Sequence, residues 1–168
     1  MTRVFFVRHA QSDSAWADDR TRPLTPAGLA DCGKVTALLS RIPVDVFLSS
    51  PYKRSVDTVS GAAGFFKMDI RTDERFRERR VGENGYAVET LERRWSDFGF
   101  HEEGGESLGS VRKRNAEALN DALRMCAGKN IVIGTHGTAL SAILNYCDDS
   151  FGCEGFKRIR HSTGVRKH

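Results

Sequence analysis

The sequence predicts an α/β protein, a three-layer αβα sandwich around a mostly parallel central sheet. Short unbroken apolar runs recur, as at Val4–Val7 and Asn130–Gly134, and such runs are typical of strands buried on both faces of a parallel sheet. Between the runs, apolar residues recur every three to four positions, as in amphipathic helices. The alternation of the two patterns indicates parallel strands joined by crossover helices.

The totals of the chain fit one compact domain. The 168 residues are 39% hydrophobic and 29% charged, close to globular norms. We expect a single domain over residues 1–168, with a charged, glycine-interrupted excursion at about residues 71–106 over the predicted site. The net charge of +4 fits an acidic ligand, but it fits a solvated basic surface equally well.

The sequence favours a cytoplasmic protein. No apolar run approaches the roughly twenty residues that span a bilayer, and the start, Met-Thr-Arg followed directly by a predicted strand, lacks the layout of a signal peptide. The cysteines have no CxxC or other metal-ligand spacing, so we expect reduced thiols. They are Cys32, Cys126, Cys147 and Cys153.

Arg8 and His9 follow the first predicted strand, Val4–Val7. In open α/β sheets, ligands bind in the crevice at the carboxyl ends of the strands. A cation and an imidazole at that end indicate an anionic substrate and a nucleophile or base. The loop from Ser12 to Arg22 would form a rim of the crevice.

The next segment predicts a helix with a defined start. Thr25 is the expected N-cap and Pro26 stands at the first helical position, where its missing amide costs nothing. Pro43 would end the helix. Its predicted buried face consists of Leu29, Cys32, Val35, Leu39 and Ile42.

A second strand is predicted over Val44–Leu48, and Ser49–Thr58 leads from it into a second helix. Arg54 would lie in or just beyond the first turn, where free backbone amides and its guanidinium could together bind an anion. The alternative is that Arg54 pairs with Asp57 one turn on and faces water, and the local pattern alone favours this alternative.

The middle of the chain predicts a short third strand within Phe65–Ile70 and one helix at about Val88–Asp97 in the excursion. Glu78 is one carboxylate among many there, with an ion pair to Arg75 or Arg79 as its alternative role. The aromatic residues could line a pocket or anchor loops on the core. They are Trp16, Trp95, Phe98 and Phe100.

After Gly104–Ser107 a long helix is predicted to about Ala127. Its expected buried face consists of Leu108, Val111, Leu119, Ala122, Leu123 and Cys126. The next strand, residues 130–134, ends in Thr135-His136-Gly137, which again delivers a histidine at a carboxyl end. A short helix over Thr138–Tyr146 and a last strand over Phe156–Arg160 complete the prediction, followed by a basic tail from His161 to His168.

Six short motifs, in order along nearly the whole chain, resemble the histidine phosphatase superfamily, also called the phosphoglycerate mutase-like family. They are Arg8-His9-Ala10, Pro23-Leu24-Thr25 with Gly28, Ser49-Ser50-Pro51 with Arg54 and Thr58, Arg77-Glu78 with Gly82, Gly105-Glu106-Ser107, and Thr135-His136-Gly137. The resemblance implies a phosphoglycerate mutase-like fold.

The resemblance also implies a phosphatase that uses a phosphohistidine intermediate on His9, with Glu78 as proton donor and Glu83 as the second candidate. Arg8, Arg54 and His136 would surround the phosphoryl group. No metal or other cofactor is implied. The residues implied to bind the substrate are Arg8, Ser14, Arg22, Arg54, His136 and Gly137.

The sequence departs from the family pattern at several positions. Ala10 replaces the motif glycine, and Ala15 stands where many members carry an asparagine, which leaves Arg22 or Ser14 to compensate. The segment after the proton donor is short, at residues 82–85, and the chain stops earlier than many members. Mutases usually carry an Arg-His-Tyr signature after the Glu, whereas this chain has Arg79-Arg80-Val81, so hydrolysis is favoured over transfer.

Three other functions stay open. The first is a mutase or other phosphoryl transferase that uses the same His9. The second takes His9, His136 and Glu78 as metal ligands, although two nearby arginines would repel a cation. The third is a non-catalytic module that binds a phosphorylated or acidic partner. Its basic cluster would be Lys157, Arg158, Arg160, Arg166 and Lys167.

We expect a small phosphomonoester or a phosphoprotein as substrate. Neither a nucleic-acid partner nor a membrane is expected, because the sequence contains no recognised nucleic-acid motif and no spanning segment. The pattern assigns no oligomeric state.

Overall fold

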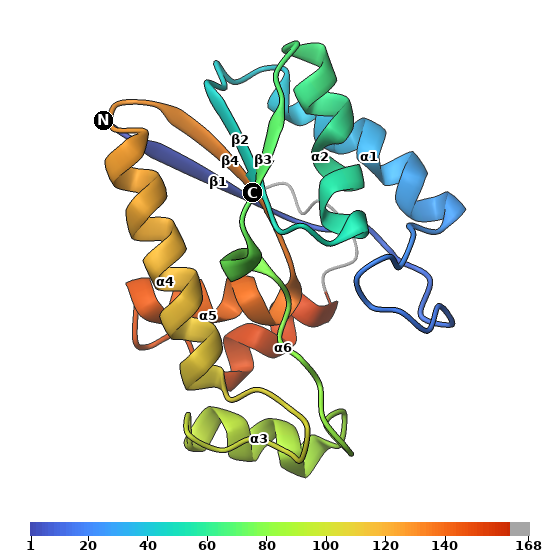
Figure 1. Cartoon of the computed structure of the whole chain (residues 1–168), viewed down its shortest axis with the longest axis vertical. Helices are drawn as coiled ribbons and strands as arrows, with labels where there is room; N and C mark the ends of the chain where they lie inside the picture. Colours follow the sequence, from blue (N-terminus) through green and yellow to red (C-terminus); the bar gives the residue numbers. More distant parts are fainter. Residues whose placement is uncertain (162–168) are drawn as a thin grey trace. The chain divides into compact units, whose positions relative to one another are not determined.

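A computed structural model describes residues 1–161 of the chain (Figure 1). The strands are β1 (Arg3–Arg8), β2 (Val46–Ser49), β3 (Ile70–Thr72) and β4 (Asn130–Thr135). The helices are α1 (Pro26–Leu39), α2 (Lys53–Phe65), α3 (Val88–Ser96), α4 (Leu108–Met125), α5 (Gly137–Cys147) and α6 (Cys153–His161), with a 3-10 turn, η1, at Glu74–Phe76. Arg166 and Lys167 of the predicted basic cluster, and most of the predicted tail, lie outside the described residues.

The four strands form one parallel sheet in the order β1-β4-β2-β3. In the register, Arg8 at the end of β1 pairs with Thr135 at the end of β4, and Ser49 at the end of β2 pairs with Gly134. The strands therefore end level with one another. The parallel α/β sheet predicted from the alternating patterns is confirmed.

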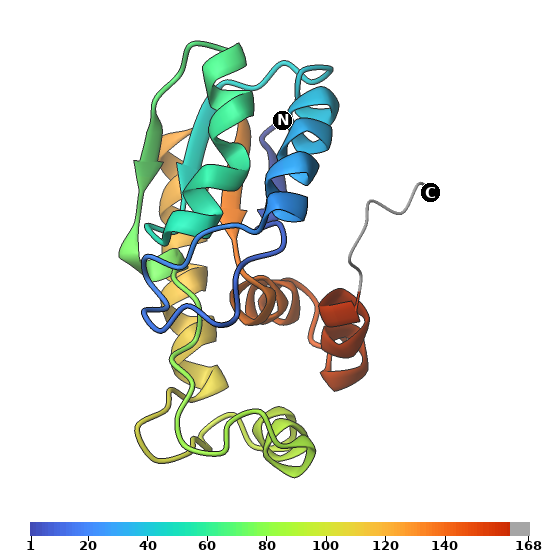
Figure 2. The same cartoon turned by 90° about the vertical axis from the view of Figure 1, so that its right-hand side faces the viewer.

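Helices cover both faces of the sheet. Figures 1 and 2 show α1 and α2 on one face and the half of α4 from Ala118 onward on the other. Val132 packs into the core beneath α1 and α2, whereas Ile131 and Ile133 alternate with it and are fully buried on the opposite face. The core under α1 and α2 consists of Leu39, Val44, Phe47, Val59, Ala62, Ala63 and Val132.

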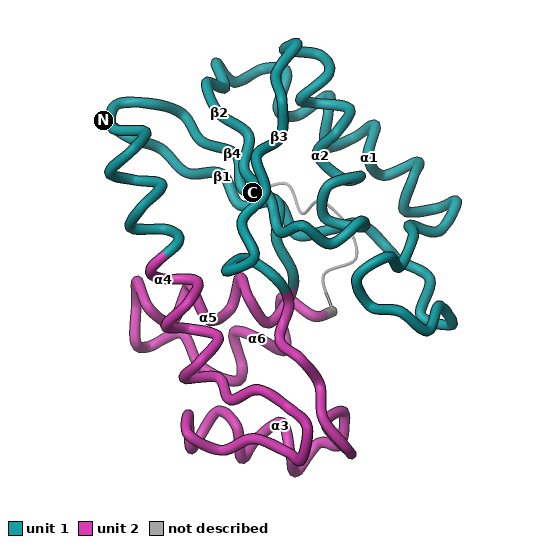
Figure 3. Tube along the Cα trace, in the orientation of Figure 1, with its two compact units in different colours: residues 1–77, 118–136 teal, residues 78–117, 137–168 magenta. Residues whose placement is uncertain are grey.

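The chain divides into two compact units (Figure 3). Unit 1 comprises residues 1–77 and 118–136 and holds the whole sheet with α1 and α2. Unit 2 comprises residues 78–117 and the chain from 137 onward, and it holds α3, α5, α6 and the first part of α4. Within unit 2, α6 packs against both α3 and α5.

Unit 2 has a small aromatic core around Trp95. The Trp95 ring lies 5.8 Å from Phe98, 6.4 Å from Phe151 and 5.9 Å from Phe156, measured between ring centroids. Trp95 and Phe98 therefore anchor their segment on a core, the second of the two roles predicted for the excursion's aromatic residues. Trp16, by contrast, is about half exposed, and its indole nitrogen donates to Thr21.

The predicted last strand, Phe156–Arg160, is wrong, because these residues lie inside helix α6. Gly155 and Phe156 are its two buried positions, and they are adjacent, whereas neighbouring residues of a strand point to opposite faces. The third strand also lies later than expected, at Ile70–Thr72, where it pairs with β2.

Burial differs from the prediction at β1 and on two helices. The apolar side chains of β1 are only half-buried, because β1 is an edge strand. Leu29 in α1 is 59% exposed and Leu123 in α4 is 36% exposed. In α1 the inward position belongs to Gly28, where an added Cβ would lie 2.1 Å from the Gln11 carbonyl oxygen, so Leu29 next to it turns outward.

Within residues 1–161, no helix is both long and apolar enough to cross a membrane.

Candidate functional site

His9 lies one residue beyond the end of β1, and its orientation is fixed by the backbone. Its amide donates to the Thr135 carbonyl, which continues the pairing with β4, and its ring Nδ1 lies 2.7 Å from the Ala10 carbonyl oxygen. A carbonyl can only accept a hydrogen bond, so Nδ1 carries the proton. The lone pair of the neutral ring is then on Nε2, where a nucleophile needs it.

The surroundings of His9 keep its imidazole uncharged. Burial and the positive charges of Arg54, Arg8 and Arg22 lower the pKa of His9 from its ordinary 6.5 to about 3, although the hydrogen bond to Ala10 opposes the shift. At neutral pH the ring is therefore neutral. A neutral imidazole beside guanidinium groups is suited to attack an anionic electrophile.

Arg54 belongs to unit 1 and is buried, with 3% of its side chain exposed. Its Nη2 lies 3.2 Å from Asp19 Oδ1, and Arg22 Nη1 lies 3.3 Å from the same oxygen. The Nε atoms of Arg22 and Arg54 are buried and have no hydrogen-bond partner among residues 1–161. Asp19 thus binds the Nη atoms of both guanidinium groups, and the Nε–H donor of each arginine stays buried without a partner among the residues that the structure describes. Buried charged donors of this kind are what a site for a further anion requires.

The expectation that Arg54 pairs with Asp57 is wrong. Lys53 makes that pair, with Nζ 2.7 Å from Asp57 Oδ2 on the exposed side of α2. Lys53 is four residues from Asp57, the spacing at which side chains share a helix face. Arg54 instead bonds Asp19, thirty-five residues earlier in the chain.

His136 follows β4 as His9 follows β1, and it is fully buried. The two imidazole centroids are 5.2 Å apart, and His136 Nε2 lies 2.7 Å from Ser50 Oγ. Tyr52 packs edge-on against His136 at 5.2 Å and also lies under the Arg54 guanidinium. Equal register at two adjacent strand ends therefore brings the two predicted histidines together.

Three residues of this group were given no role by the sequence. Ser50 and Thr58 belong to a recognised motif, and Thr58 Oγ1 accepts from the Ala10 amide while it donates to the Arg54 carbonyl. Thr58 thereby ties the chain after His9 to the first turn of α2. Asp19 lies in a polar loop that has neither a motif nor an apolar periodicity, so nothing in the local sequence could have identified it as a partner of Arg54.

Glu78 lies in unit 2, and its carboxyl group is bound by backbone amides. Its Oε1 accepts from the amides of Arg79 at 2.8 Å and Ala139 at 3.1 Å, and its Oε2 accepts from Thr138 at 3.1 Å. Thr138 and Ala139 are in the first turn of α5, where backbone amides have no hydrogen-bond partner within the helix and are free to bind the carboxyl group.

The arginines considered as partners of Glu78 make other ion pairs. Arg79 forms a two-pronged pair with Glu102, at 2.7 and 3.0 Å, and Arg94 donates to the same carboxylate at 2.7 Å. All three side chains are buried. Arg75 pairs with Asp73 and Asp121 in unit 1.

The remaining predicted residues are distributed as follows. Arg8 is the last residue of β1 and is half-buried, whereas Ser14 is exposed in a turn. Gly137 is the first residue of α5 and belongs to unit 2. Glu83 is exposed, and its amide donates to the Glu103 carbonyl. In the described part of the chain, no three His, Cys, Asp or Glu side chains are grouped so that they could hold a metal ion.

A parallel α/β protein with two histidines just beyond adjacent strand ends, and with the buried Arg54 in the same cluster, has the features of a phosphoryl-group enzyme. Residues 4–165 match the model of the histidine phosphatase superfamily, branch 1, and the chain belongs to this superfamily. Its members are generally phosphatases or mutases, and the resemblance inferred from the motifs is confirmed.

Curated relatives include both kinds of enzyme. The chain is 30% identical over 179 aligned positions to phosphoserine phosphatase 1 of Hydrogenobacter thermophilus, covering 92% of this chain and 83% of the relative. It is 27% identical over 170 positions to 2,3-bisphosphoglycerate-dependent phosphoglycerate mutase 2 of Gloeobacter violaceus, covering 88% and 76%.

Solved structures confirm the phosphoglycerate mutase-like fold. A phosphoserine phosphatase mutant from Entamoeba histolytica, in complex with phosphoserine, superimposes with a TM-score of 0.78 at 20% identity, covering 94% of this chain and 85% of that one. YhfR of Bacillus stearothermophilus gives a TM-score of 0.75 at 21% identity, covering 89% and 81%.

Proposed function

We propose that the protein hydrolyses phosphomonoesters through a phosphohistidine formed on His9. The observation that carries the proposal is the state of that imidazole. The ring is neutral, its Nδ1 hydrogen is bound by the Ala10 carbonyl, and the charges of Arg54, Arg8 and Arg22 act on it. Neither the attack on a phosphate nor the binding of its charge needs a group from outside this cluster.

In the first step, the lone pair of His9 Nε2 attacks phosphorus and the bond from phosphorus to the ester oxygen breaks. Arg8, Arg22, Arg54 and His136 would stabilise the charge on the other phosphoryl oxygens, and the buried Nε atoms of Arg22 and Arg54 are available donors. Glu78 would give its proton to the departing alkoxide. The products are the alcohol and phosphorylated His9.

In the second step, water attacks the same phosphorus and the bond from phosphorus to Nε2 breaks. The electron pair returns to the imidazole, and Glu78 takes a proton from the water, which restores its carboxylic acid. Inorganic phosphate then leaves. Each step moves one proton through Glu78, so the cycle balances.

We assign the proton transfers to Glu78 rather than Glu83. Three backbone amides hold the Glu78 carboxyl group, whereas the Glu83 side chain is exposed. A general acid must stay within hydrogen-bond reach of the reacting oxygen, and a fixed carboxyl group satisfies this condition better than a solvated one. The match of Arg77-Glu78 to the family motif supports the same choice.

Phosphoserine and phosphoglycerate are the substrates to examine first, because the relatives named above are a phosphoserine phosphatase and a phosphoglycerate mutase. We favour hydrolysis over mutase transfer, since Arg79-Arg80-Val81 replaces the signature that mutases usually carry after the Glu.

The test is phosphate release from nitrophenyl phosphate and from phosphoserine, in the presence of a chelator, by the wild type, His9→Ala and His101→Ala. His101 is exposed in unit 2 and serves as the matched control. We expect the wild type and His101→Ala to release phosphate at similar rates, and the rate of His9→Ala to be at least about a thousandfold lower. Turnover that survives in His9→Ala, or that the chelator abolishes, would overturn the phosphohistidine route.

A further inference from the structure

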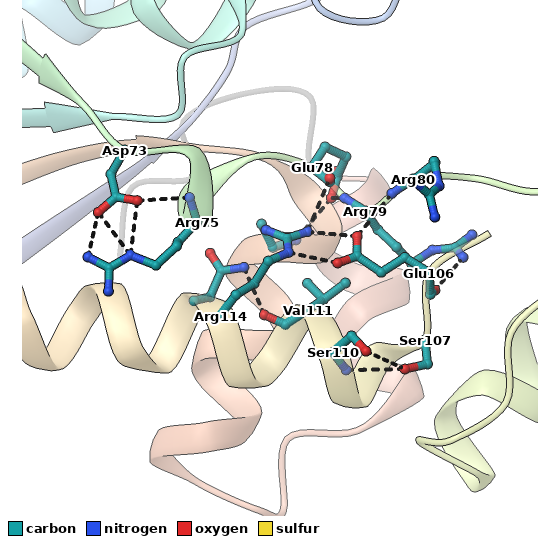
Figure 4. A network of polar contacts seen from close by, with 12 residues as sticks. Asp73, Arg75, Glu78, Arg79, Arg80, Glu106, Ser107, Ser110, Val111 and Arg114 are labelled. Atoms are coloured by element: carbon teal, nitrogen blue, oxygen red, sulfur yellow. Dashed lines mark hydrogen bonds and ion pairs between the residues drawn. The ribbon is translucent and has the colours of Figure 1, made fainter. Parts of the chain in front are cut away.

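Two residues outside the segment of Glu78 hold its backbone, at the Glu78 carbonyl and at Arg80 two residues further on. Arg114, in α4, donates from Nη2 to the Glu78 carbonyl oxygen at 3.2 Å. Glu106 contacts Arg80 twice, because its amide donates to the Arg80 carbonyl at 2.9 Å and its Oε2 lies 3.3 Å from the Arg80 amide. Figure 4 shows these contacts converging on residues 78–80.

Arg114 and Glu106 also bind each other in a two-pronged ion pair. Arg114 Nε lies 2.8 Å from Glu106 Oε1, and Nη2 lies 3.0 Å from Oε2. Their side chains are only 14% and 10% exposed, so water screens the pair little. Two parallel charge-assisted hydrogen bonds fix both the distance and the planes of the two groups.

The side chain of Glu78 is held separately from its backbone. The carboxyl group is bound by the amides of α5, while the carbonyl is bound by Arg114 from α4. Only the short side chain lies between these two attachments. Movement of the backbone would therefore pull the carboxyl group from the amides of Thr138 and Ala139.

We propose that the Arg114–Glu106 pair is a positioning device for Glu78, which sets where the proton donor of the reaction lies. The inference rests on the proposed function, because it assumes that Glu78 transfers the proton. Neither Arg114 nor Glu106 needs to touch the substrate. A displacement of about 1 Å in a catalytic group can cost about a hundredfold in rate, so the pair controls the rate through geometry alone.

A purely structural pair would behave differently from a positioning pair. Loss of general structure lowers turnover of every substrate in proportion. Loss of the proton donor's position slows esters with poorly stabilised alkoxides far more than nitrophenyl phosphate, whose phenolate scarcely needs a proton. The ratio of the two rates therefore separates the two roles.

The experiment compares Arg114→Met, Arg114→Lys and Glu106→Gln with the wild type on phosphoserine, or the best alkyl phosphate found, and on nitrophenyl phosphate. We expect Arg114→Met to lower kcat on the alkyl ester about tenfold to a hundredfold and on nitrophenyl phosphate less than about threefold. Arg114→Lys should recover part of the loss, because it keeps the charge but not the two-pronged geometry. Glu106→Gln breaks the same ion pair while it keeps the shape of the side chain, and it replaces Arg114→Met in the test if that variant does not fold.

Arg112→Met is the matched control. Arg112 lies in the same helix and is also bonded, to Asn145 Oδ1 at 2.9 Å, but it makes no contact with residues 78–80 that the structure records. We expect its two substrate rates to change by the same factor. Equal losses on both substrates in Arg114→Met and Glu106→Gln, or no loss on either, would overturn the proposal.

A second measurement tests the device without turnover. Hydrogen exchange of the Thr138 and Ala139 amides, followed by NMR, should accelerate severalfold in Arg114→Met and not in Arg112→Met, because these amides are protected by the Glu78 carboxyl group. Unchanged exchange refutes the positioning role. If exchange accelerates in Arg114→Met but the wild type has no phosphatase activity, the proposed function is refuted. The link between Arg114 and the position of Glu78 then still holds.

Discussion

The protonation of His9 connects the site to the stability of the fold. In the folded chain the pKa of His9 is about 3, whereas an unfolded chain gives the ordinary 6.5. Between these two pH values the unfolded state binds a proton that the folded state does not bind. Stability must therefore rise with pH across this window and fall as the solution is acidified.

We predict that this dependence weakens in His9→Gln. As the pH falls below 6.5, the wild type should lose stability relative to His9→Gln by about 1.4 kcal/mol for each pH unit, until the folded pKa is approached. Urea unfolding at pH 7.5, 5.5 and 4.5 measures the difference, with His101→Gln as control. Parallel stability curves for the wild type and His9→Gln would show that the ring is not held neutral.

Arg54 should carry a large part of the affinity for phosphate-like anions. We predict that Arg54→Ala weakens vanadate or phosphate binding by about 1.5–3 kcal/mol, because it removes a buried, charged hydrogen-bond donor. Isothermal titration calorimetry measures the affinity. Lys53→Ala is the control, since Lys53 is the next residue but pairs with Asp57 at the surface; equal effects of the two changes would remove Arg54 from the anion site.

At the residue scale, the sequence predicted which residues belong to the site better than it predicted their hydrogen-bond and ion-pair partners. His9, Arg54 and His136 were named from their motifs and lie together in unit 1. Their partners were not predictable, because Asp19 is thirty-five positions from Arg54 and Ser50 is eighty-six from His136. Contacts over such separations depend on the register of the sheet, which local patterns do not contain.

At the scale of the elements, helix α1 shows how one close approach determines an orientation. Gly28 faces the Gln11 backbone, with no room for a side chain, whereas Gly33 in the same helix has nothing within 4 Å of an added Cβ. The N-cap also acts here, since the Gly28 amide donates to Thr25 Oγ1 at 3.0 Å. Both glycines lie in one helix, but only the first is required by packing.

We predict opposite effects of alanine at these two positions. Gly28→Ala should lower the free energy of unfolding by about 1–3 kcal/mol or more, because the new methyl group meets backbone that cannot rotate away. Gly33→Ala should raise it by about 0.5–1 kcal/mol, because alanine loses less conformational entropy in a helix. Urea unfolding at neutral pH measures both. Equal signs would refute the packing argument.

The elements with strong periodicity were predicted with small errors. The expected N-cap Thr25 and first helical residue Pro26 are confirmed, and the helix expected over Val88–Asp97 is α3 at Val88–Ser96. Segments shorter than two helical turns were ambiguous. Phe156–Arg160 has too few apolar residues to separate a strand from a helix, and its packing against Trp95 in unit 2 decided the outcome.

At the scale of the whole molecule, the residues that were given roles in the proposed reaction are divided between the two units. His9, Arg54 and His136 belong to unit 1, while Glu78 and Gly137 belong to unit 2. The chain passes from one unit to the other directly before Glu78 and directly after His136. The alternating patterns predicted the parallel sheet and the order of the motifs predicted the family. Neither contained a sign of this division, because the motifs follow one another across it.

The bond between His9 and the Ala10 carbonyl has a consequence for the lifetime of the phosphorylated enzyme. Many catalytic histidines are paired with a carboxylate that stabilises a positive ring, but His9 has a neutral carbonyl as its partner and arginines nearby. A ring that resists positive charge is also a good leaving group once it carries a phosphoryl group, because breaking the bond from phosphorus to Nε2 returns it to the neutral form. In the proposed cycle the phosphorylated form would therefore decay quickly and stay scarce during turnover, ready to pass its phosphoryl group to the first acceptor that reaches it.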